Sequence, residues 1–413
     1  MKIRPRFSFS GDFKIPGDKS ITHRAVLFNG IAAGEAVVTN ALLGADCLSS
    51  VACMRALGAQ IEVEGDKIHV RGAQGLRAAD CDCGNSGTTM RLLMGLVAGQ
   101  GVDARLTGDD SLSRRPMERV AAPLRLLGAE IETTGGYAAV AVRPARLCGC
   151  TVDTQVASAQ VKSALILAAL GADGETVVRE PLLSRDHTER MLAAMGADLH
   201  ADGCTVTVRR SSLRAVDVAV PADISSAAYF MALGALCGET LCRGVGINPT
   251  RTGILTVFDQ MGVDYALENM RTVCGEPVAD IRVRKSALRA VRLGRAVMPS
   301  LIDELPVIAV LCAYADGESV ISGAEELRVK ESDRIRTTAA MLTALGGDVE
   351  ERPDGFIIRG KKKLRGGTVD SCADHRIAMS GAVALAASEQ GGEILGAECV
   401  DISFPNFFTL LDS

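Results

Sequence analysis

A short repeated pattern constrains the fold of this chain more than any other feature of its sequence. In each copy an apolar helix end is followed by Met or Leu, then Gly, then a small residue and a strand-like stretch. The glycines of the five clear copies are Gly58, Gly128, Gly196, Gly262 and Gly346. Glycine is favoured directly after a helix because its backbone enters the left-handed region without steric cost.

The spacing of this pattern predicts the architecture. Successive glycines lie between 66 and 84 residues apart in a chain of 413 residues. Self-similarity at such a period indicates a repeated α/β unit, here about two helices and several strands. Five copies leave a sixth that is degenerate or split between the two chain ends. Length alone favours two or three domains.

Six segments have a polar start followed by small and apolar residues, which predicts buried helices. Their apolar bodies are residues 21–33, 90–98, 161–170, 227–237, 305–315 and 377–387. Ser, Thr, Asn and Asp at these starts are ordinary N-caps. Lys19 and Arg376 are not, because a cation near a helix start opposes the helix dipole. These two residues therefore indicate an anion held by the cation and the helix N-terminus together.

Composition and charge exclude several classes of protein. The net charge of −5 argues against a nucleic-acid-binding protein. The longest apolar run, residues 305–315, is shorter than the ~20 residues of a membrane span. The start of the chain, MKIRPRFSFSG, lacks the apolar segment of a secretion signal, so we expect a cytoplasmic protein. The close pairs Cys81/Cys83 and Cys148/Cys150 lack zinc-site spacing, and no metal site is predicted.

Three charged segments carry candidate binding groups. In PGDKSITHR, residues 16–24, Ser20 and Arg24 share one helix face. Residues 109–117 bring two arginines to an expected helix start, and arginine suits carboxylate and phosphate. Residues 327–334 place alternating charges in one expected helix start, with a solvated charged turn as the alternative.

Taken together, these segments resemble the 5-enolpyruvylshikimate-3-phosphate synthases from Pro16 to Phe408, and the Ser-Ala-Gln subgroup in particular. The further matching segments, in chain order, are GNSGTTMR (84–91), RRPM (114–117), SAQVKSALILA (158–168), SRDHTERML (184–192), DISSAAYF (223–230), IDELP (302–306), RVKESDRI (328–335), DHRIAMS (374–380) and SFPNFF (403–408). The order of the segments is more specific than any one of them.

The resemblance implies an α/β fold, the two-domain inside-out α/β barrel. It consists of six repeats of a βαβαββ unit, three in each domain. We expect a first, continuous lobe at residues 14–221 on the shikimate-phosphate side. A second, discontinuous lobe is expected at residues 1–13 and 222–413 and carries the catalytic acid and base. The active site is expected in the cleft between the lobes.

The resemblance also implies a reaction of the shikimate pathway, which leads to chorismate and the aromatic amino acids. The enolpyruvyl group of phosphoenolpyruvate is transferred to the 5-hydroxyl of shikimate 3-phosphate, with release of phosphate. No cofactor is implied, and the two substrates are the only partners expected, with neither nucleic acid nor membrane. We expect a monomer. The family is the target of the inhibitor glyphosate.

Residue roles follow from the same resemblance. Residues matching shikimate 3-phosphate contacts are Lys19, Ser20, Arg24, Ser158, Gln160, Arg185, Asp303 and Lys330. Residues matching phosphoenolpyruvate contacts are Lys19, Gly87, Arg115, Gln160, Arg334 and Arg376. The expected catalytic groups are Lys19, Asp303 as the base, Glu331 for proton transfer, and Lys330. His187 is expected to make a local hydrogen bond.

Three positions depart from the pattern of other family members. Ser403 stands where some have Lys, Ala159 where some have a second Ser, and Glu326 where some have Asn. A contact from Ser403 to phosphoenolpyruvate is therefore not expected.

Two alternative functions remain open. The related transferase that uses UDP-N-acetylglucosamine shares the fold and the donor, but usually works with a loop Cys where this chain has the arginine-rich residues 111–117. A non-catalytic anion-binding α/β repeat protein keeps the arginines, but has no use for Asp303, Lys330 and Glu331 together.

Overall fold

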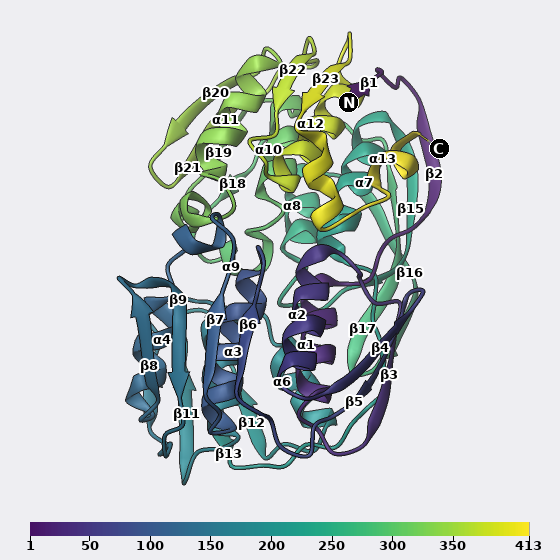
Figure 1. Ribbon diagram of the computed structural model, residues 1–413. Coiled ribbons are helices and arrows are strands. Elements are labelled where there is room, and N and C mark those ends of the chain that lie inside the picture. Colours follow the sequence, from purple (N-terminus) through teal and green to yellow (C-terminus); the bar gives the residue numbers. More distant parts are fainter. Residues whose placement is uncertain (413) are drawn as a thin grey trace. The chain divides into compact units, whose positions relative to one another are not determined.

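The computed structural model describes residues 1–412 and divides into two compact units (Figure 1). The first unit contains residues 17–220 and 273–276, and the second contains residues 1–16, 221–272 and 277–412. The chain changes unit between Pro16 and Gly17 and between Val220 and Pro221. The sequence placed these crossings near Lys14 and Pro221, and no pattern singled out residues 273–276.

The first unit has three four-stranded sheets and six α-helices among its described residues. Its helices are α1 (Lys19–Asn29), α2 (Ala45–Ala56), α3 (Gly87–Gly99), α4 (Glu118–Leu126), α5 (Ala159–Ala169) and α6 (His187–Ala194), with the 3-10 helix η1 (Leu112–Arg114). Its strands are β3 (Glu35–Thr39), β4 (Gln60–Glu64), β5 (Lys67–Arg71), β6 (Ala79–Asp82), β7 (Ala104–Thr107), β8 (Glu130–Thr134), β9 (Tyr137–Arg143), β10 (Thr151–Asp153), β11 (Glu175–Arg179), β12 (Leu199–Asp202), β13 (Thr205–Arg209) and β14 (Val218–Ala219).

The second unit repeats this plan with two four-stranded sheets and one three-stranded sheet. Its helices are α7 (Ile224–Cys237), α8 (Gly253–Met261), α9 (Met298–Leu301), α10 (Leu305–Tyr314), α11 (Arg334–Ala344), α12 (His375–Ala387) and α13 (Phe407–Asp412), with the 3-10 helices η2 (Glu325–Val329) and η3 (Ala397–Ile402). Its strands are β1 (Lys2–Ile3), β2 (Phe9–Lys14), β15 (Gly238–Gly246), β16 (Asp264–Val273), β17 (Glu276–Arg284), β18 (Arg292–Leu293), β19 (Glu318–Ile321), β20 (Asp348–Arg352), β21 (Gly355–Arg359), β22 (Gly367–Asp370) and β23 (Gly392–Leu395).

The six sheets share one topology. In each four-stranded sheet a parallel pair is extended by further strands, as in the order β6-β7-β9-β8, where β6 and β7 are parallel and the other neighbours antiparallel. The three-stranded sheet has the order β1-β23-β22, so a strand from the chain start pairs with one near its end. This confirms the predicted sixfold repeat with a last copy assembled from both chain ends.

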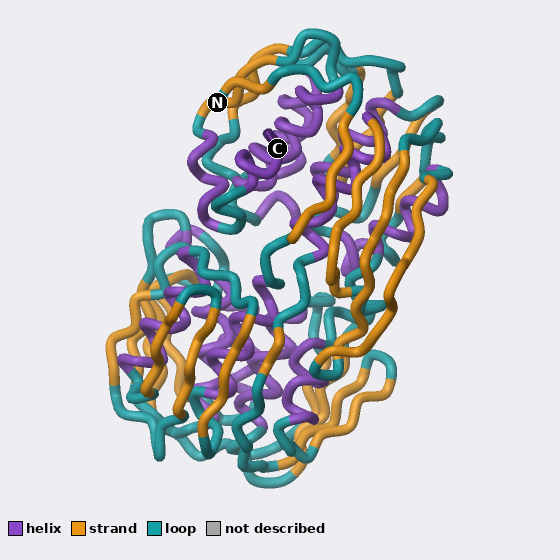
Figure 2. Tube along the Cα trace, turned by 90° about the vertical axis from the view of Figure 1, so that its right-hand side faces the viewer, coloured by secondary structure: helices purple, strands orange, loops and turns teal. Residues whose placement is uncertain are grey.

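Each unit has helices at its centre, with strands on its outside (Figure 2). The six predicted buried helices are confirmed as α1, α3, α5, α7, α10 and α12, and each begins within three residues of its predicted polar start. In α10 every residue from Leu305 to Ala313 is buried. A helix that is apolar on all sides is stable only inside a core, which explains why these six form the centres of the two hydrophobic cores.

Two kinds of glycine make this packing possible. The five repeat glycines all have positive φ, from 73° at Gly262 to 114° at Gly58, which confirms the predicted helix ends. Gly95 serves a different purpose, because α3 and α5 pack backbone to backbone at this point. A Cβ atom at Gly95 would lie 2.0 Å from the carbonyl oxygen of Ala164.

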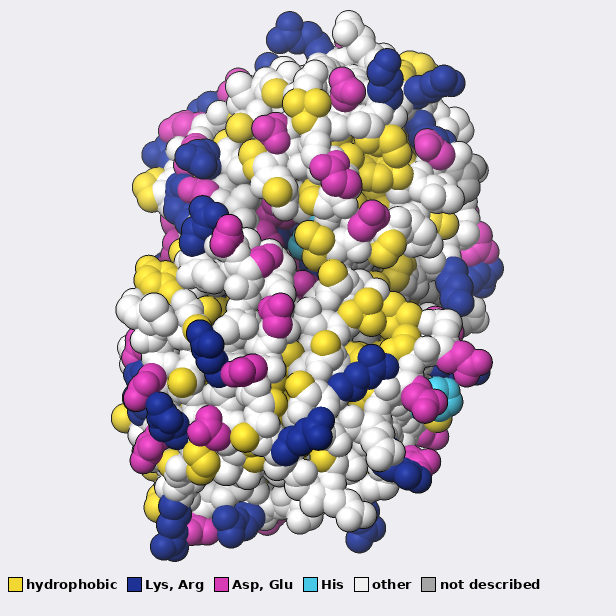
Figure 3. All heavy atoms as spheres, in the orientation of Figure 1, with side chains coloured by type: hydrophobic (Ala, Val, Ile, Leu, Met, Phe, Trp, Pro, Cys, Tyr) yellow, Lys and Arg dark blue, Asp and Glu magenta, His cyan; other side chains and the backbone are white. Residues whose placement is uncertain are grey.

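No helix formed by residues 1–412 has both the length and the apolar character needed to cross a bilayer. On the face drawn in Figure 3, basic and acidic side chains alternate, so no extended basic surface covers it. This distribution fits the net charge of −5 and differs from the basic stripe of proteins that bind nucleic acid.

Candidate active site

The predicted site residues of the first unit gather at the N-terminal ends of its three central helices. Lys19 and Ser20 open α1, and Gly87 is the first residue of α3. Ser158 is the N-cap of α5, and Gln160 is in its first turn. Helix N-termini present N–H groups and a partial positive charge, so this end of the unit favours anions.

Guanidinium groups surround Gly87 at the start of α3. A Cβ atom at Gly87 would lie 3.0 Å from an Nη atom of Arg91 and 3.6 Å from one of Arg115. The Arg91 guanidinium donates to Oε1 of Gln160 at 2.7 Å, and the Arg115 guanidinium donates to Oδ1 of Asn85 at 2.5 Å. Two arginines fixed beside a helix N-terminus form an arrangement suited to phosphate or carboxylate.

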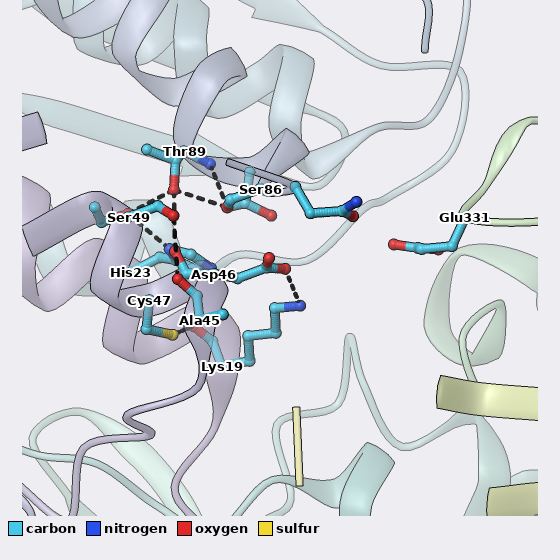
Figure 4. A network of polar contacts seen from close by, with 12 residues as sticks. Lys19, His23, Ala45, Asp46, Cys47, Ser49, Ser86, Thr89 and Glu331 are labelled. Atoms are coloured by element: carbon cyan, nitrogen blue, oxygen red, sulfur yellow. Dashed lines mark hydrogen bonds and ion pairs between the residues drawn. The ribbon is translucent and has the colours of Figure 1, made fainter. Parts of the chain in front are cut away.

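Lys19 forms an ion pair with Asp46 of α2, and Figure 4 shows the two side chains directed at each other. The Lys19 side chain is 19% exposed. The Asp46 carboxylate offsets the repulsion between the lysine and the helix dipole, so the cation at this helix start has a protein partner. The sequence indicated only an external anion here.

A buried chain of hydrogen bonds links α1, α2 and α3 (Figure 4). His23 Nδ1 contacts Ser50 Oγ at 2.8 Å, and Ser50 Oγ contacts Thr89 Oγ1 at 2.8 Å. The Thr89 hydroxyl donates to Ser86 Oγ at 2.7 Å, and Ser86 is the N-cap of α3. Burial, with the nearby Lys19 charge, lowers the pKa of His23 to about 3, so its imidazole stays neutral.

Arg24 of α1 is buried, with 2% of its surface exposed. Its guanidinium donates to the Ser20 carbonyl oxygen at 3.0 Å, to Thr188 Oγ1 at 2.7 Å and to Ser163 Oγ at 2.9 Å. Burial lowers the pKa of Arg24 to about 10, so the group stays charged near neutral pH. Arg185 lies in the segment between β11 and α6, and its charge acts on Arg24.

The second unit brings four predicted site residues together where α10 and α11 begin. Lys330 Nζ lies 3.8 Å from Asp303 Oδ1, and an Arg334 Nη atom lies 3.6 Å from the same oxygen. The Arg334 guanidinium is also 2.6 Å from Glu331. Two carboxylates and two cations in such proximity can exchange and stabilise protons.

Asp374 connects Arg334 to Arg376. Its carboxylate accepts from Nε of Arg334 at 2.8 Å, from the Ser332 hydroxyl at 2.9 Å and from the backbone N–H of Arg376 at 2.9 Å. Asp374 is the N-cap of α12 and is fully buried. Burial acts to raise the pKa of Asp374, but the Arg334 charge, its hydrogen bond and the nearby His375 together lower this pKa from its ordinary value.

The pKa of Arg376 is raised although the residue is half-buried and this burial opposes the charge. Tyr229 and the carboxylates of Asp303, Glu304 and Asp223 outweigh the effect of burial. Arg376 is therefore a permanently charged group near the predicted base Asp303.

One cavity of about 850 Å³ lies at the other end of the central helices of the first unit. Its lining includes Ile31, Gln100 and Leu170, which follow the C-terminal ends of α1, α3 and α5. None of the predicted site residues lines this cavity, so we do not assign it to the active site. Among residues 1–412, no group of three or more His, Cys, Asp and Glu side chains is arranged to hold a metal ion.

Comparison with known proteins identifies the family of this chain. Residues 3–411 match the sequence profile of EPSP synthase, described as 3-phosphoshikimate 1-carboxyvinyltransferase. The chain belongs to the EPSP synthase family. A relative from Desulfitobacterium hafniense, named 3-phosphoshikimate 1-carboxyvinyltransferase, is 49% identical over an alignment of 420 positions that covers 100% of this chain and 97% of the relative. A relative from Synechococcus sp. with the same name is 49% identical over 418 residues, covering 97% and 95% of the two chains.

Solved structures agree with this assignment to the EPSP synthase family. EPSP synthase from Acinetobacter baumannii superposes with a TM-score of 0.89 at 43% identity, covering 100% of this chain and 97% of that one. The enolpyruvyl transferase NikO from Streptomyces tendae has a TM-score of 0.78 at 19% identity over 99% and 95% of the chains. The second likeness concerns the fold alone.

Three local predictions for this family member are wrong. Arg115 does not open a helix but ends η1 in an extended conformation, because the next residue is Pro116, which disfavours helical backbone before it. Residues 327–334 are not one helix start, since η2 ends at Val329 and α11 begins at Arg334 after the Asp333 N-cap. His187 bonds Glu276, 89 positions away in sequence, and not a local group.

Several polar residues of the site were not predicted. Asn85, Arg91 and Asp374 lie inside the matching segments, and their position beside predicted residues was a usable signal. Asp46 had no such signal, because its pairing with Lys19 depends on how α1 and α2 pack.

Proposed function

We propose that this chain transfers the enolpyruvyl group of phosphoenolpyruvate to the 5-hydroxyl of shikimate 3-phosphate, releasing phosphate. The carrying observation is the 49% identity over nearly full length to relatives named 3-phosphoshikimate 1-carboxyvinyltransferase. The two groups of anion-binding side chains described above support it. One supplies cations beside helix N-termini, and the other supplies cations together with carboxylates.

Shikimate 3-phosphate is assigned chiefly to the first unit. Ser20 and Arg24 bind its phosphate from one face of α1, and Ser158 and Arg185 complete the set. Arg24 suits this role because Thr188 and Ser163 fix its guanidinium, so little side-chain entropy is lost on binding.

Phosphoenolpyruvate is assigned to arginines of both units. Arg115 and the α3 N-terminus at Gly87 bind one anionic group, and Gln160 lies beside them. Arg334 and Arg376 bind the other anionic group, and both are permanently charged. Lys19 contacts both substrates.

The carboxylates of the second unit perform the proton transfers. Asp303 removes the proton of the 5-hydroxyl group while the hydroxyl oxygen attacks C2 of phosphoenolpyruvate. Glu331 delivers a proton to C3. The tetrahedral intermediate then loses a proton from C3 and expels phosphate from C2, which restores the double bond. Lys330, 3.8 Å from Asp303, stabilises the ionised base and contacts shikimate 3-phosphate.

The test is phosphate release from purified protein with phosphoenolpyruvate and one of two acceptors. Release with shikimate 3-phosphate alone is the expected result. Release with UDP-N-acetylglucosamine alone would overturn the acceptor. No release with either acceptor, from folded protein, would leave an anion-binding protein.

A Gly87→Ala variant should weaken phosphoenolpyruvate binding. The new methyl group would lie 3.0 Å from the Arg91 guanidinium, so this group must shift, and it would fill the space beside the Arg115 guanidinium, 3.6 Å away, where the anion is proposed to bind. We expect KM for phosphoenolpyruvate to rise about tenfold, the size of effect that one methyl group has in a close-fitting pocket. KM for shikimate 3-phosphate should change little. Gly294→Ala is the control, since no atom lies within 4 Å of its added Cβ and its φ lies outside the left-handed region.

We also infer that the protein acts as a monomer in the cytoplasm. One chain carries all the groups assigned above, so the proposed reaction requires no second copy. Sedimentation equilibrium at assay concentration tests the monomer, and a dimer there would contradict it.

A further inference from the structure

Lys162 is a buried lysine that the proposed reaction does not use. It lies in the first turns of α5, and its side chain is 1% exposed. Its Nζ contacts Glu180 Oε2 at 2.9 Å and Glu189 Oε1 at 2.7 Å, and donates to the Ser184 carbonyl oxygen at 3.4 Å. Both carboxylates are also buried, with side-chain exposures of 1% for Glu180 and 6% for Glu189.

Such a cluster is costly to maintain. Each buried ion loses hydration worth several kcal/mol, and mutual attraction repays this only with close geometry and further hydrogen bonds. The two carboxylates raise the pKa of Lys162 against the opposing effect of burial, so the lysine is charged. Burial raises the pKa of Glu189, the Lys162 charge opposes this rise, and the Glu189 charge acts in turn on Arg24.

The cluster fixes the segment that carries Arg185. Glu180 directly follows β11, and it accepts from the backbone N–H of Ser184 at 3.3 Å and from its hydroxyl at 2.9 Å. Glu189 lies on α6, beyond the segment. Lys162 therefore holds the segment at both ends and at Ser184, the residue before Arg185.

Arg24 is bound to the immediate neighbours of this cluster. It donates to Ser163, next to Lys162, and to Thr188, next to Glu189. The Ser163 and Thr188 hydroxyls are themselves 2.6 Å apart. The Glu189 charge is the strongest charge acting on Arg24. Glu189 thus has two cations within its influence, and Lys162 is the one in direct contact.

We propose that Lys162 is a positioning residue for binding the phosphate of shikimate 3-phosphate. Its ammonium neutralises Glu189, so this carboxylate does not draw the Arg24 guanidinium away from the anion, and it holds Arg185 in place through Ser184. The inference rests on the proposed function, because it takes Arg24 and Arg185 as phosphate ligands.

A matched pair of double variants tests this role. Lys162→Met should raise KM for shikimate 3-phosphate about tenfold, a typical coupling within one charged network, and leave KM for phosphoenolpyruvate within about twofold. Lys162→Met/Glu189→Gln should recover most of this loss, because the competing carboxylate is gone. Lys162→Met/Glu180→Gln carries the same charge but retains Glu189, so its KM for shikimate 3-phosphate should stay as high as that of Lys162→Met.

Each outcome has a definite meaning. If Lys162→Met does not fold, the two double variants decide alone, since each has lost one cation and one anion. Equal KM values for shikimate 3-phosphate in the two double variants would overturn the positioning role. An equal rise in KM for shikimate 3-phosphate and for phosphoenolpyruvate would also overturn it. Unfolding of all three would assign the cluster to the fold alone and also overturn it. Wild-type turnover with shikimate 3-phosphate is measured first, so failure of the proposed function is recognised separately.

Discussion

An Asp303→Asn variant should turn over at least about 100-fold more slowly than the wild type, the usual contribution of a general base. Asparagine keeps the shape of aspartate and one acceptor oxygen, but its NH2 group donates hydrogen bonds and it has no carboxylate to accept the hydroxyl proton. Shikimate 3-phosphate should still bind, because its proposed phosphate ligands lie on the first unit. The measurement is kcat from phosphate release, together with the dissociation constant of shikimate 3-phosphate by calorimetry.

Glu326→Gln is the matched control for this variant. Glu326 also lies close to Lys330, with Oε1 3.5 Å from Nζ, but no proton transfer is assigned to it. The control should therefore keep most of its turnover. If Asp303→Asn retains more than a tenth of wild-type kcat, the base is another group, and Glu331 becomes the first residue to test. If both variants lose turnover alike, the charge balance around Lys330 is the cause.

The periodic features of this fold were predictable because they arise from local physics. Each repeat glycine follows a helix and has positive φ, a preference encoded within a few residues. The central helices were recognisable because an apolar run without polar sides has no stable place except a core. Counting copies predicted a sixth repeat that is degenerate or split between the chain ends, and the pairing of β1 with β23 supports the split form.

The site was predictable only where the matching segments name a residue. Arg24 and Arg334 were predicted as site residues in this way, but the partners that fix them were not predicted. Thr188 lies 164 positions from Arg24, and Asp374 lies 40 from Arg334. Such partners are chosen by tertiary packing, which no sequence period records. Lys162 shows the same limit, since its position in an apolar helix gives no sign of two buried carboxylates.

An Arg334→Met variant should destabilise the second unit by about 3–5 kcal/mol, because it leaves Asp374 as a buried carboxylate without its cation. Arg334 is 2% exposed and Asp374 is 0% exposed, so water cannot replace the lost partner. Thermal unfolding followed by calorimetry should show a fall of about 10 °C for this unit. Arg336→Met, on the exposed face of the same helix, is the control and should stay within about 0.5 kcal/mol.

The effect of pH separates this cause from a simple loss of packing. In the wild type the folded-state pKa of Asp374 is lowered, so its contribution to stability is present above pH 3.8 and is lost as pH falls. In Arg334→Met, burial without the cation raises this pKa, so protonation on acidification relieves the strain. The difference between the two proteins should therefore be largest near neutral pH and shrink toward pH 4. A difference independent of pH would mean that Arg334 stabilises the unit through packing of its side chain, and the carboxylate would then have another counter-charge. Arg334→Met/Asp374→Asn should recover most of the stability at neutral pH without recovering phosphoenolpyruvate binding, because the double variant removes the buried charge but still lacks the proposed ligand.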